Sequence, residues 1–187
     1  EAFSDCLALN EVKLCETISD IGDYAFYDTS LSSYTIPDAQ TVGDYAFYGT
    51  NIETVDFTEI TAVGSYAFAD CDKLEEVNIS YQITVGDGAF ANCDELSAIT
   101  LSDVKDIPAN VIEGCPKIVV IEFNQITELP VAENGTSYVS DKPLLNEFLV
   151  DYVTSVPDDY FINNPELYSV YMPSLEYVGD RAFMNTS

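Results

Sequence analysis

The sequence has 187 residues, of which 47% are hydrophobic, so it can bury a core of ordinary size. It contains 33 Asp and Glu against 6 Lys and Arg, for a formal net charge of −27. Because nucleic acids and anionic membranes are bound through Lys and Arg, we expect no nucleic acid and no acidic membrane among the partners.

Three absences narrow the function classes further. No run approaches the roughly 18 apolar residues of a membrane-spanning helix, which predicts no direct insertion into a membrane. The chain has no His, and this removes both the imidazole base of common catalytic triads and the histidine metal ligand. The five Cys, an odd number without a C-x-x-C pair, fit neither a disulfide framework nor a zinc ribbon. We therefore expect no metal and no cofactor.

One apolar pattern repeats along the chain. Each unit opens with a triplet of the form L-x-x-V-x-L, first seen as Leu9-Val12-Leu14. In chain order the later copies are Leu31-Tyr34-Ile36, Ile52-Val55-Phe57, Leu74-Val77-Ile79, Leu96-Ile99-Leu101, Ile118-Ile121-Phe123, Leu145-Phe148-Val150 and Leu167-Val170-Met172. The leading residues are 22, 21, 22, 22, 22, 27 and 22 residues apart. This period predicts about eight units, each beginning with a short strand.

Each unit also has two further recurring positions, which follow the triplet. About 11 residues after the leading residue stands a second apolar position, usually followed by Gly or Pro: Ile21, Val42, Val63, Val85, Ile107, Leu129, Val156 and Val178. Five residues further on stand Phe26, Phe47, Phe68, Phe90, Phe161 and Phe183, with Ile112 in this place once. We expect a second short extended piece followed by a brief helical turn around Ala-Phe.

The units should stack into a solenoid. Successive strands would pair in parallel about 4.8 Å apart, and the Phe residues would form a buried column. The sixth unit, residues 118–144, lacks this Phe and is 27 residues long. We expect residues 1–187 to be a single domain that is cut within a repeat at both ends and is part of a longer chain.

The composite unit L-x-x-V-x-I-P-x-x-x-T-x-V-G-x-x-A-F-x-x-C, seen in residues 31–47 and 74–93, resembles the BspA-type leucine-rich repeat of surface proteins. The resemblance implies a leucine-rich repeat solenoid, a right-handed superhelix of the α/β class with mostly short parallel strands and short helical or 3-10 turns. Residues 138–141 resemble a hairpin-like variant that the family also uses. The family further implies adhesion to host matrix, other cells or a glycan coat.

Paired carboxylates are the remaining route to catalysis, for example Asp158 with Asp159, Glu75 with Glu76, or Asp70 with Asp72. A glycosidase needs two carboxylates across a cleft, one of them with a pKa raised by burial. These acids fall in predicted turns or on exposed strand positions. We therefore interpret them as solvated surface acids and expect no enzyme.

The cysteines suggest structure rather than chemistry. Cys6, Cys71, Cys93 and Cys115 share one repeat position, three residues after the Phe column. We expect buried free thiols that bond backbone groups at a turn, although neighbouring coils would also bring their Cα atoms within disulfide range. Cys15 lies off this column and is the best candidate for an accessible thiol.

Two further columns repeat near the Ala-Phe stretch. Asp23, Asp44 and Asp87 precede the expected helical turn, which favours helix capping over a calcium ladder. An aromatic column is formed by Tyr24, Tyr45 and Tyr66, with Tyr27 and Tyr48 beside it. Such a column could hold a sugar ring, but it more often covers the seams of a solenoid.

The strand residues between the triplet positions should point outward along the concave sheet. Val120, Leu149 and Tyr171 fall on consecutive units as an apolar group among acids, which indicates a protein-contact patch, with an ordinary surface as the alternative. The candidate partner-binding surface comprises Val120, Leu149, Tyr171, Glu122, Glu147, Glu76 and Asp56.

Two functional hypotheses follow. The first is a non-enzymatic binding module, secreted or at the cell surface, with a protein or glycan ligand, because a solenoid supplies extended area. The second is a structural spacer or stalk segment of a larger surface protein.

Overall fold

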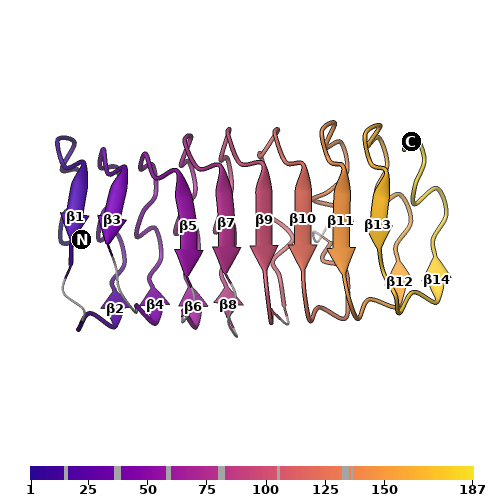
Figure 1. Ribbon diagram of the computed structural model, residues 1–187, viewed down its shortest axis with the longest axis horizontal. Helices are drawn as coiled ribbons and strands as arrows, with labels where there is room; N and C mark the ends of the chain where they lie inside the picture. The colour runs from indigo at the N-terminus through magenta and orange to yellow at the C-terminus, as the bar shows by residue number, and fades with distance from the viewer. Residues whose placement is uncertain are drawn as a thin grey trace.

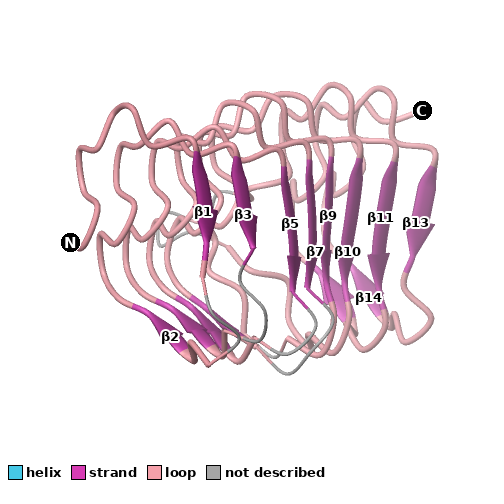
Figure 2. Ribbon diagram, turned by 60° about the vertical axis from the view of Figure 1, so that its left-hand side comes forward, coloured by secondary structure: helices cyan, strands magenta, loops and turns pink. Residues whose placement is uncertain are grey.

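The computed structural model describes residues 1–14, 17–35, 39–57, 60–79, 83–104, 106–131, 135 and 137–187, with the side chains of 33–35 excepted. The chain winds into coils that follow one another along one long axis, with the N-terminus near one end and the C-terminus at the other (Figure 1). A typical coil passes through a longer strand, a shorter strand and a corner of tight turns (Figure 2). The predicted solenoid is confirmed.

The longer strands form one side of the coils. They are β1 (Glu11–Lys13), β3 (Ser33–Thr35), β5 (Thr54–Phe57), β7 (Glu76–Ile79), β9 (Ala98–Leu101), β10 (Val120–Phe123), β11 (Glu147–Val150) and β13 (Ser169–Tyr171). β1 pairs with β3, and the others form a six-stranded sheet of order β5-β7-β9-β10-β11-β13, all in parallel. Val55 lies opposite Val77, and Val77 opposite Ile99, so equivalent triplet residues stack. Ile36 of the second triplet lies outside the described residues.

The shorter strands line a second side. They are β2 (Asp20–Ile21), β4 (Thr41–Val42), β6 (Ala62–Val63), β8 (Thr84–Val85), β12 (Ser155–Val156) and β14 (Tyr177–Val178). They form two separate parallel sheets, β2-β4-β6-β8 and β12-β14. A Gly follows β4, β6, β8 and β14 and donates its N–H to the preceding coil, as Gly43 does to the Ile21 carbonyl and Gly86 to the Val63 carbonyl, both at 2.8 Å.

Three prolines explain the break between these two sheets. Pro108, Pro130 and Pro157 take the place of that Gly in three consecutive coils. Proline has no backbone N–H, so the coil-to-coil bond that Gly donates elsewhere cannot form. Accordingly, residues 106–107 and 128–129 are not paired strands, although the sequence predicts a second extended piece in every unit.

The corner around Ala-Phe is a ladder of turns between coils. The N–H of Tyr24 donates to the Asp44 carbonyl at 2.9 Å, and that of Phe26 to the Ala46 carbonyl at 2.7 Å. Because every second N–H is directed to the next coil, helical bonding to the fourth preceding residue cannot develop, and Tyr24 adopts a positive φ of 55°. Within the described ranges no helix forms, so the expected brief helical turns are wrong.

The core is a column of aromatic rings flanked by the apolar faces of the strands. Phe47 stacks on Phe26 at 5.1 Å and on Phe68 at 5.0 Å between ring centroids, and Phe90 follows Phe68 at 5.7 Å. These rings are almost fully buried. In β5 and β7 the residues alternate between exposed and buried, as expected for strands that face the core on one side. The predicted Phe column is confirmed.

The enlarged unit keeps a corner of turns at residues 138–141, where the N–H of Asp141 donates to the Ile162 carbonyl at 3.1 Å. Val131 pairs with Ser137 in an antiparallel bridge. Tyr138 then contacts Phe123, with centroids 6.2 Å apart, and meets Tyr160 edge-on at 6.3 Å. Tyr138 therefore contributes aromatic packing to the core in the unit that lacks Ala-Phe.

Candidate functional site

The predicted partner-binding residues lie on the outward side of the longer strands. In β10 and β11, half-buried residues alternate with fully buried ones. Val120, Glu122, Glu147 and Leu149 occupy the half-buried positions, and Tyr171 on β13 is 54% exposed. All of these side chains are therefore accessible from one face of the six-stranded sheet.

Strand register decides which of these residues are neighbours. Leu149 lies opposite Glu122 on one side and opposite Tyr171 on the other. Val120 lies opposite Glu147, which is two residues before Leu149 on the same strand. These five residues form one continuous surface over β10, β11 and β13, which we call the C-terminal patch.

The other two predicted residues lie away from this patch. Glu76 on β7 is separated from Val120 by Ala98 of the intervening strand. Asp56 lies on β5, the edge strand at the opposite end of the sheet. Both are exposed, but the structure brings neither into contact range of Leu149 through the sheet register.

Tyr168 adds an aromatic residue that sequence reasoning missed. Its side chain is 68% exposed, and its hydroxyl donates to Glu147 Oε1 at 2.7 Å. This hydrogen bond, together with the charge of Glu147, raises the pKa of Tyr168. Other units carry Asn, Ser, Glu or Val at this position, so an aromatic residue there was the available signal. Tyr168 joins the C-terminal patch through Glu147.

The buried thiols satisfy backbone carbonyls at the corner. Cys71 donates to the carbonyl of Phe47, and Cys93 to that of Phe68, both at 3.2 Å. Cys71, Cys93 and Cys115 are fully buried and free, as predicted, whereas Cys6 at the first corner is free but exposed. Burial raises the pKa of Cys71 to about 11. Cys15 lies outside the described residues.

Lys142 occupies the position of this column in the enlarged unit, three residues before the leading Leu145. Its ammonium donates to the carbonyls of Ile112 at 3.2 Å and Cys115 at 3.1 Å, and only 8% of the residue is exposed. Burial lowers the pKa of Lys142. In the following coil, Asn164 occupies the same position, and its side-chain amide donates to the carbonyls of Val139 at 2.8 Å and Phe161 at 3.0 Å. Sequence reasoning missed Lys142, although its place three residues before Leu145, like that of Cys71 before Leu74, was the available signal.

The Asp column caps the neighbouring coil. Oδ1 of Asp23 accepts the N–H of Asp44 at 2.9 Å, and Oδ1 of Asp44 accepts the N–H of Ser65 at 2.7 Å. The prediction that each Asp caps its own helical turn is therefore wrong, because the corner N–H groups face the next coil. The Asp carboxylates nevertheless accept backbone N–H groups, as the sequence interpretation proposed.

The Tyr column is closely stacked. Tyr45 lies between Tyr24 and Tyr66, with ring centroids 5.0 and 5.2 Å away and planes within 17°. Tyr27 and Tyr48 stack in the same way at 5.1 Å. The ring faces that a sugar would need are thus occupied by neighbouring tyrosines, which supports the packing interpretation.

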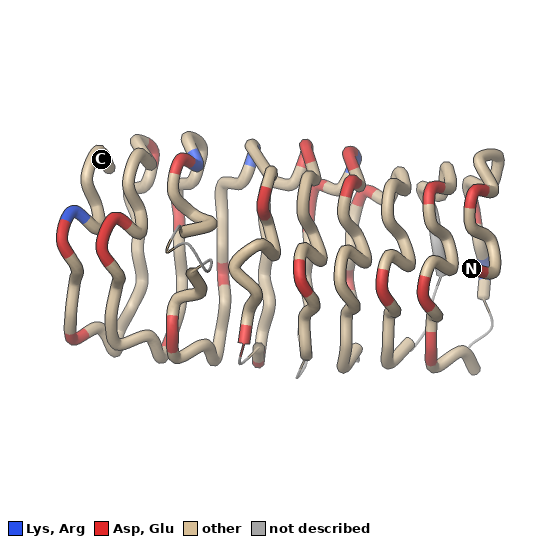
Figure 3. Tube along the Cα trace, turned by 180° about the vertical axis from the view of Figure 1, so that it is seen from behind, with Lys and Arg blue, Asp and Glu red and all other residues tan. Residues whose placement is uncertain are grey.

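The carboxylate pairs considered for catalysis serve coil-to-coil contacts or face solvent. Asp158 accepts the N–H of Asp180 at 2.7 Å, and Asp159 pairs with Arg181 at 2.5 Å. Acids recur from coil to coil on the side seen in Figure 3, where Lys and Arg are few. Over the described ranges, no three His, Cys, Asp or Glu side chains gather to hold a metal ion.

In the part of the chain that the structure describes, no helix combines the length and apolar character needed to span a bilayer.

Comparison with known proteins gives a family and a fold. The family model described as BspA type leucine rich repeat region matches in 6 copies, over residues 1–119 and 82–187. A leucine-rich repeat protein from Bacteroides ovatus aligns over 98% of this chain and 66% of its own, at 21% identity and a TM-score of 0.60. The T. pallidum leucine-rich repeat protein aligns over 94% and 80%, at 18% identity and a TM-score of 0.52. No curated protein matches the sequence.

At these identities the two solved structures show the fold alone. This chain spans 66% of the length of the Bacteroides ovatus protein. The family matches together run from the first residue to the last. The chain therefore belongs to the BspA-type leucine-rich repeat family.

Proposed function

We propose that this chain is a non-enzymatic binding module, secreted or displayed at a cell surface, which meets a protein or glycan ligand through the C-terminal patch. The observation that carries the proposal is the position of Leu149 between Glu122 and Tyr171 on an open sheet face. Apolar and aromatic side chains within a charged rim are the composition of protein-contact surfaces.

Charge supports a partner with basic groups near its contact surface. The strands β5 to β13 of the six-stranded sheet carry Asp56, Glu76, Glu122 and Glu147 but no Lys or Arg. A face with charge of one sign speeds encounter with a partner of opposite sign and disfavours acidic partners. The apolar residues would then supply contact area, and the acids would supply selectivity.

The family supports the surface location and the adhesive role. The BspA-type leucine-rich repeat is a repeat of surface proteins. A solenoid of such repeats exposes an extended face on rigid strands. Such a face is suited to binding a large ligand rather than to enclosing a small substrate.

The experiment is an array of glycans and matrix proteins probed at two salt concentrations. We expect the double variant Leu149→Ala and Tyr171→Ala to bind its ligand at least about tenfold more weakly, because both are contact residues. Tyr177→Ala is the matched control, since Tyr177 is 61% exposed on β14 of the other sheet. Equal binding by wild type and the double variant would contradict the proposal.

A spacer role is the second candidate. The coils follow one axis and the two ends of the described chain lie far apart along it (Figure 1), which suits a segment that holds other parts at a distance. Wild-type protein that binds nothing on the array at either salt concentration would favour this role.

A further inference from the structure

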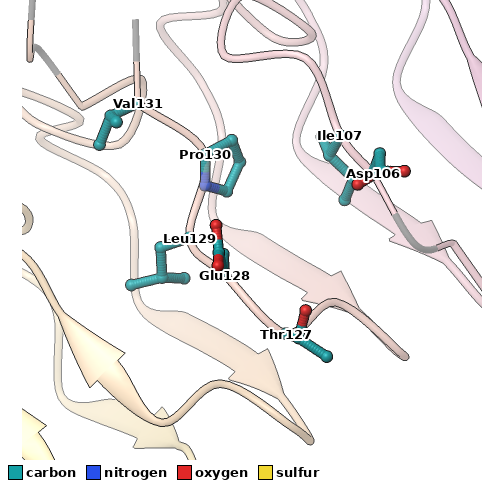
Figure 4. Close-up of a pocket in the computed structure, with 7 residues that line it drawn as sticks. All are labelled: Asp106, Ile107, Thr127, Glu128, Leu129, Pro130 and Val131. Carbon is teal, nitrogen blue, oxygen red and sulfur yellow. The ribbon is translucent and has the colours of Figure 1, made fainter.

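The surface is hollowed where the sheets of shorter strands are interrupted. A cavity of about 470 Å³ lies there, lined by Asp106, Ile107, Thr127, Glu128, Leu129, Pro130 and Val131. In Figure 4, Asp106 and Ile107 lie on one segment, and Thr127 to Val131 lie on the next. We call this cavity the proline cleft. Its volume is within the range of about 300–1,000 Å³ that is usual for ligand pockets.

The prolines remove hydrogen-bond donors from this part of the surface. In the intact sheets, a Gly N–H bonds the carbonyl of the preceding coil, as Gly64 bonds Val42 and Gly179 bonds Val156, both at 2.8 Å. Pro130 and Pro157 cannot donate this bond to the carbonyls of Ile107 and Leu129. The backbone around the cleft is therefore richer in acceptors than the sheets on either side of it.

The side chains add more acceptors over an apolar floor. Ile107 and Leu129 are only 8% and 6% exposed, and they form the base of the cleft together with Pro130. Asp106 and Glu128 are exposed at equivalent positions of the two coils. None of the seven lining residues is positively charged. Two carboxylates above apolar carbon atoms match a ligand with a cationic head and a hydrocarbon stem.

We propose that the proline cleft binds a lysine or arginine side chain of a protein partner. The methylene stem packs on Leu129, Pro130 and Val131, and the ammonium or guanidinium donates to Asp106 and Glu128. Arginine is favoured over lysine, because its planar group can donate to both carboxylates at once. Among the described residues, the ion pairs of this chain engage Glu11, Glu95 and Asp159, and neither cleft carboxylate is in one of them.

This site is separate from the C-terminal patch. The patch lies on the longer strands, whereas the cleft interrupts the side formed by the shorter strands. Either site can therefore bind its ligand without the other. The variants that test the two sites change different residues.

The test is an NMR titration of the whole isotope-labelled chain with arginine blocked as the N-acetyl methylamide. Blocked lysine and blocked citrulline are the comparison probes, because citrulline has nearly the shape of arginine without its charge. We expect saturable shifts of the amides of residues 106–107 and 127–129 with arginine, weaker binding of lysine, and no saturation with citrulline.

Variants of equal charge separate a built site from general attraction to an acidic protein. Asp106→Asn with Glu128→Gln removes two charges from the cleft, and Asp72→Asn with Glu75→Gln removes two exposed charges elsewhere. We expect the first pair to weaken arginine binding at least about fivefold and the second to leave it within about twofold. Equal weakening by both pairs, saturation by citrulline, or shifts spread over the acidic surface would overturn the proposal.

Discussion

The ammonium of Lys142 donates a hydrogen bond of 3.2 Å to the carbonyl of Ile112, 30 residues earlier in the chain. In the preceding coil the equivalent carbonyl, that of Phe90, accepts from the thiol of Cys115 at 3.2 Å. Lys142 stands three residues before the leading Leu145, as Cys115 stands three residues before Ile118, so Lys142 is the corner residue of the sixth unit. In this one coil a cationic side chain occupies a column that holds thiols, hydroxyls and the amide of Asn164 elsewhere.

Replacing Lys142 by Met keeps most of the stem and removes the donors. The carbonyls of Ile112 and Cys115 would then be left without this partner, and each unsatisfied buried group costs about 1–3 kcal/mol. We expect the free energy of unfolding, measured by urea denaturation, to fall accordingly. Lys117→Met is the control, because its ion pair with Glu95 is exposed to solvent and contributes little to stability. Similar losses in the two variants would contradict the role assigned to Lys142.

The Phe column should dominate stability. Phe47 is fully buried between Phe26 and Phe68, so Phe47→Ala leaves a cavity within the stack. We expect a loss of about 3–5 kcal/mol in unfolding free energy by chemical denaturation. Tyr177→Ala, at an exposed position, should change it by less than about 0.5 kcal/mol. A Phe47→Ala protein of unchanged stability would show that the column is not the main support of the fold.

The Gly column is required for close approach of neighbouring coils. A Cβ added to Gly64 would lie 2.6 Å from both the backbone nitrogen and Oδ1 of Asp44, whereas one added to Gly22 would meet nothing within 4 Å. We expect Gly64→Ala to destabilise the protein by about 1–3 kcal/mol in thermal unfolding. Gly22→Ala should be close to neutral. The same melting temperature for both variants would show that the coils separate easily at this position.

Ionisation of buried thiols should limit stability at alkaline pH. The pKa of Cys71 is raised from 9.0 to about 11 by burial, so the thiol ionises at lower pH in the unfolded chain than in the folded one. Its contribution is complete below pH 9 and is lost as the pH rises toward 11, by about 3 kcal/mol.

The variant Cys71→Thr isolates this effect, because Thr29 and Thr50 occupy the same column in other coils and do not ionise. Across this pH range, the unfolding free energy of the variant should fall less steeply than that of the wild type. Parallel pH profiles for the two proteins would show that Cys71 does not ionise on unfolding as proposed.

Much of the architecture could be predicted from spacing. Residues that recur at 21 or 22 positions lie over one another once the chain coils, so Phe47 must meet Phe68 and Val55 must meet Val77. Burial of the triplet, the Phe stack and the free thiols of Cys71 and Cys93 all follow from this rule. The outward position of Leu149 and Tyr171 follows from strand alternation in the same way.

The tertiary structure decided which group of the next coil each polar atom meets. Sequence spacing does not give the direction of the corner N–H groups, and so it predicted helical turns capped by Asp23 where a ladder between coils exists. Pro130 was visible in the sequence, but its effect depends on the Ile107 carbonyl that stands opposite it. Lys142 stands at the column position of its unit, but only the assembled coils show that its ammonium donates to the Ile112 carbonyl. The sequence repeat by itself determined which apolar residues stack, because burial requires only that they lie close together. Hydrogen bonds also require that donor and acceptor point toward each other, and this orientation is set only when the coils assemble.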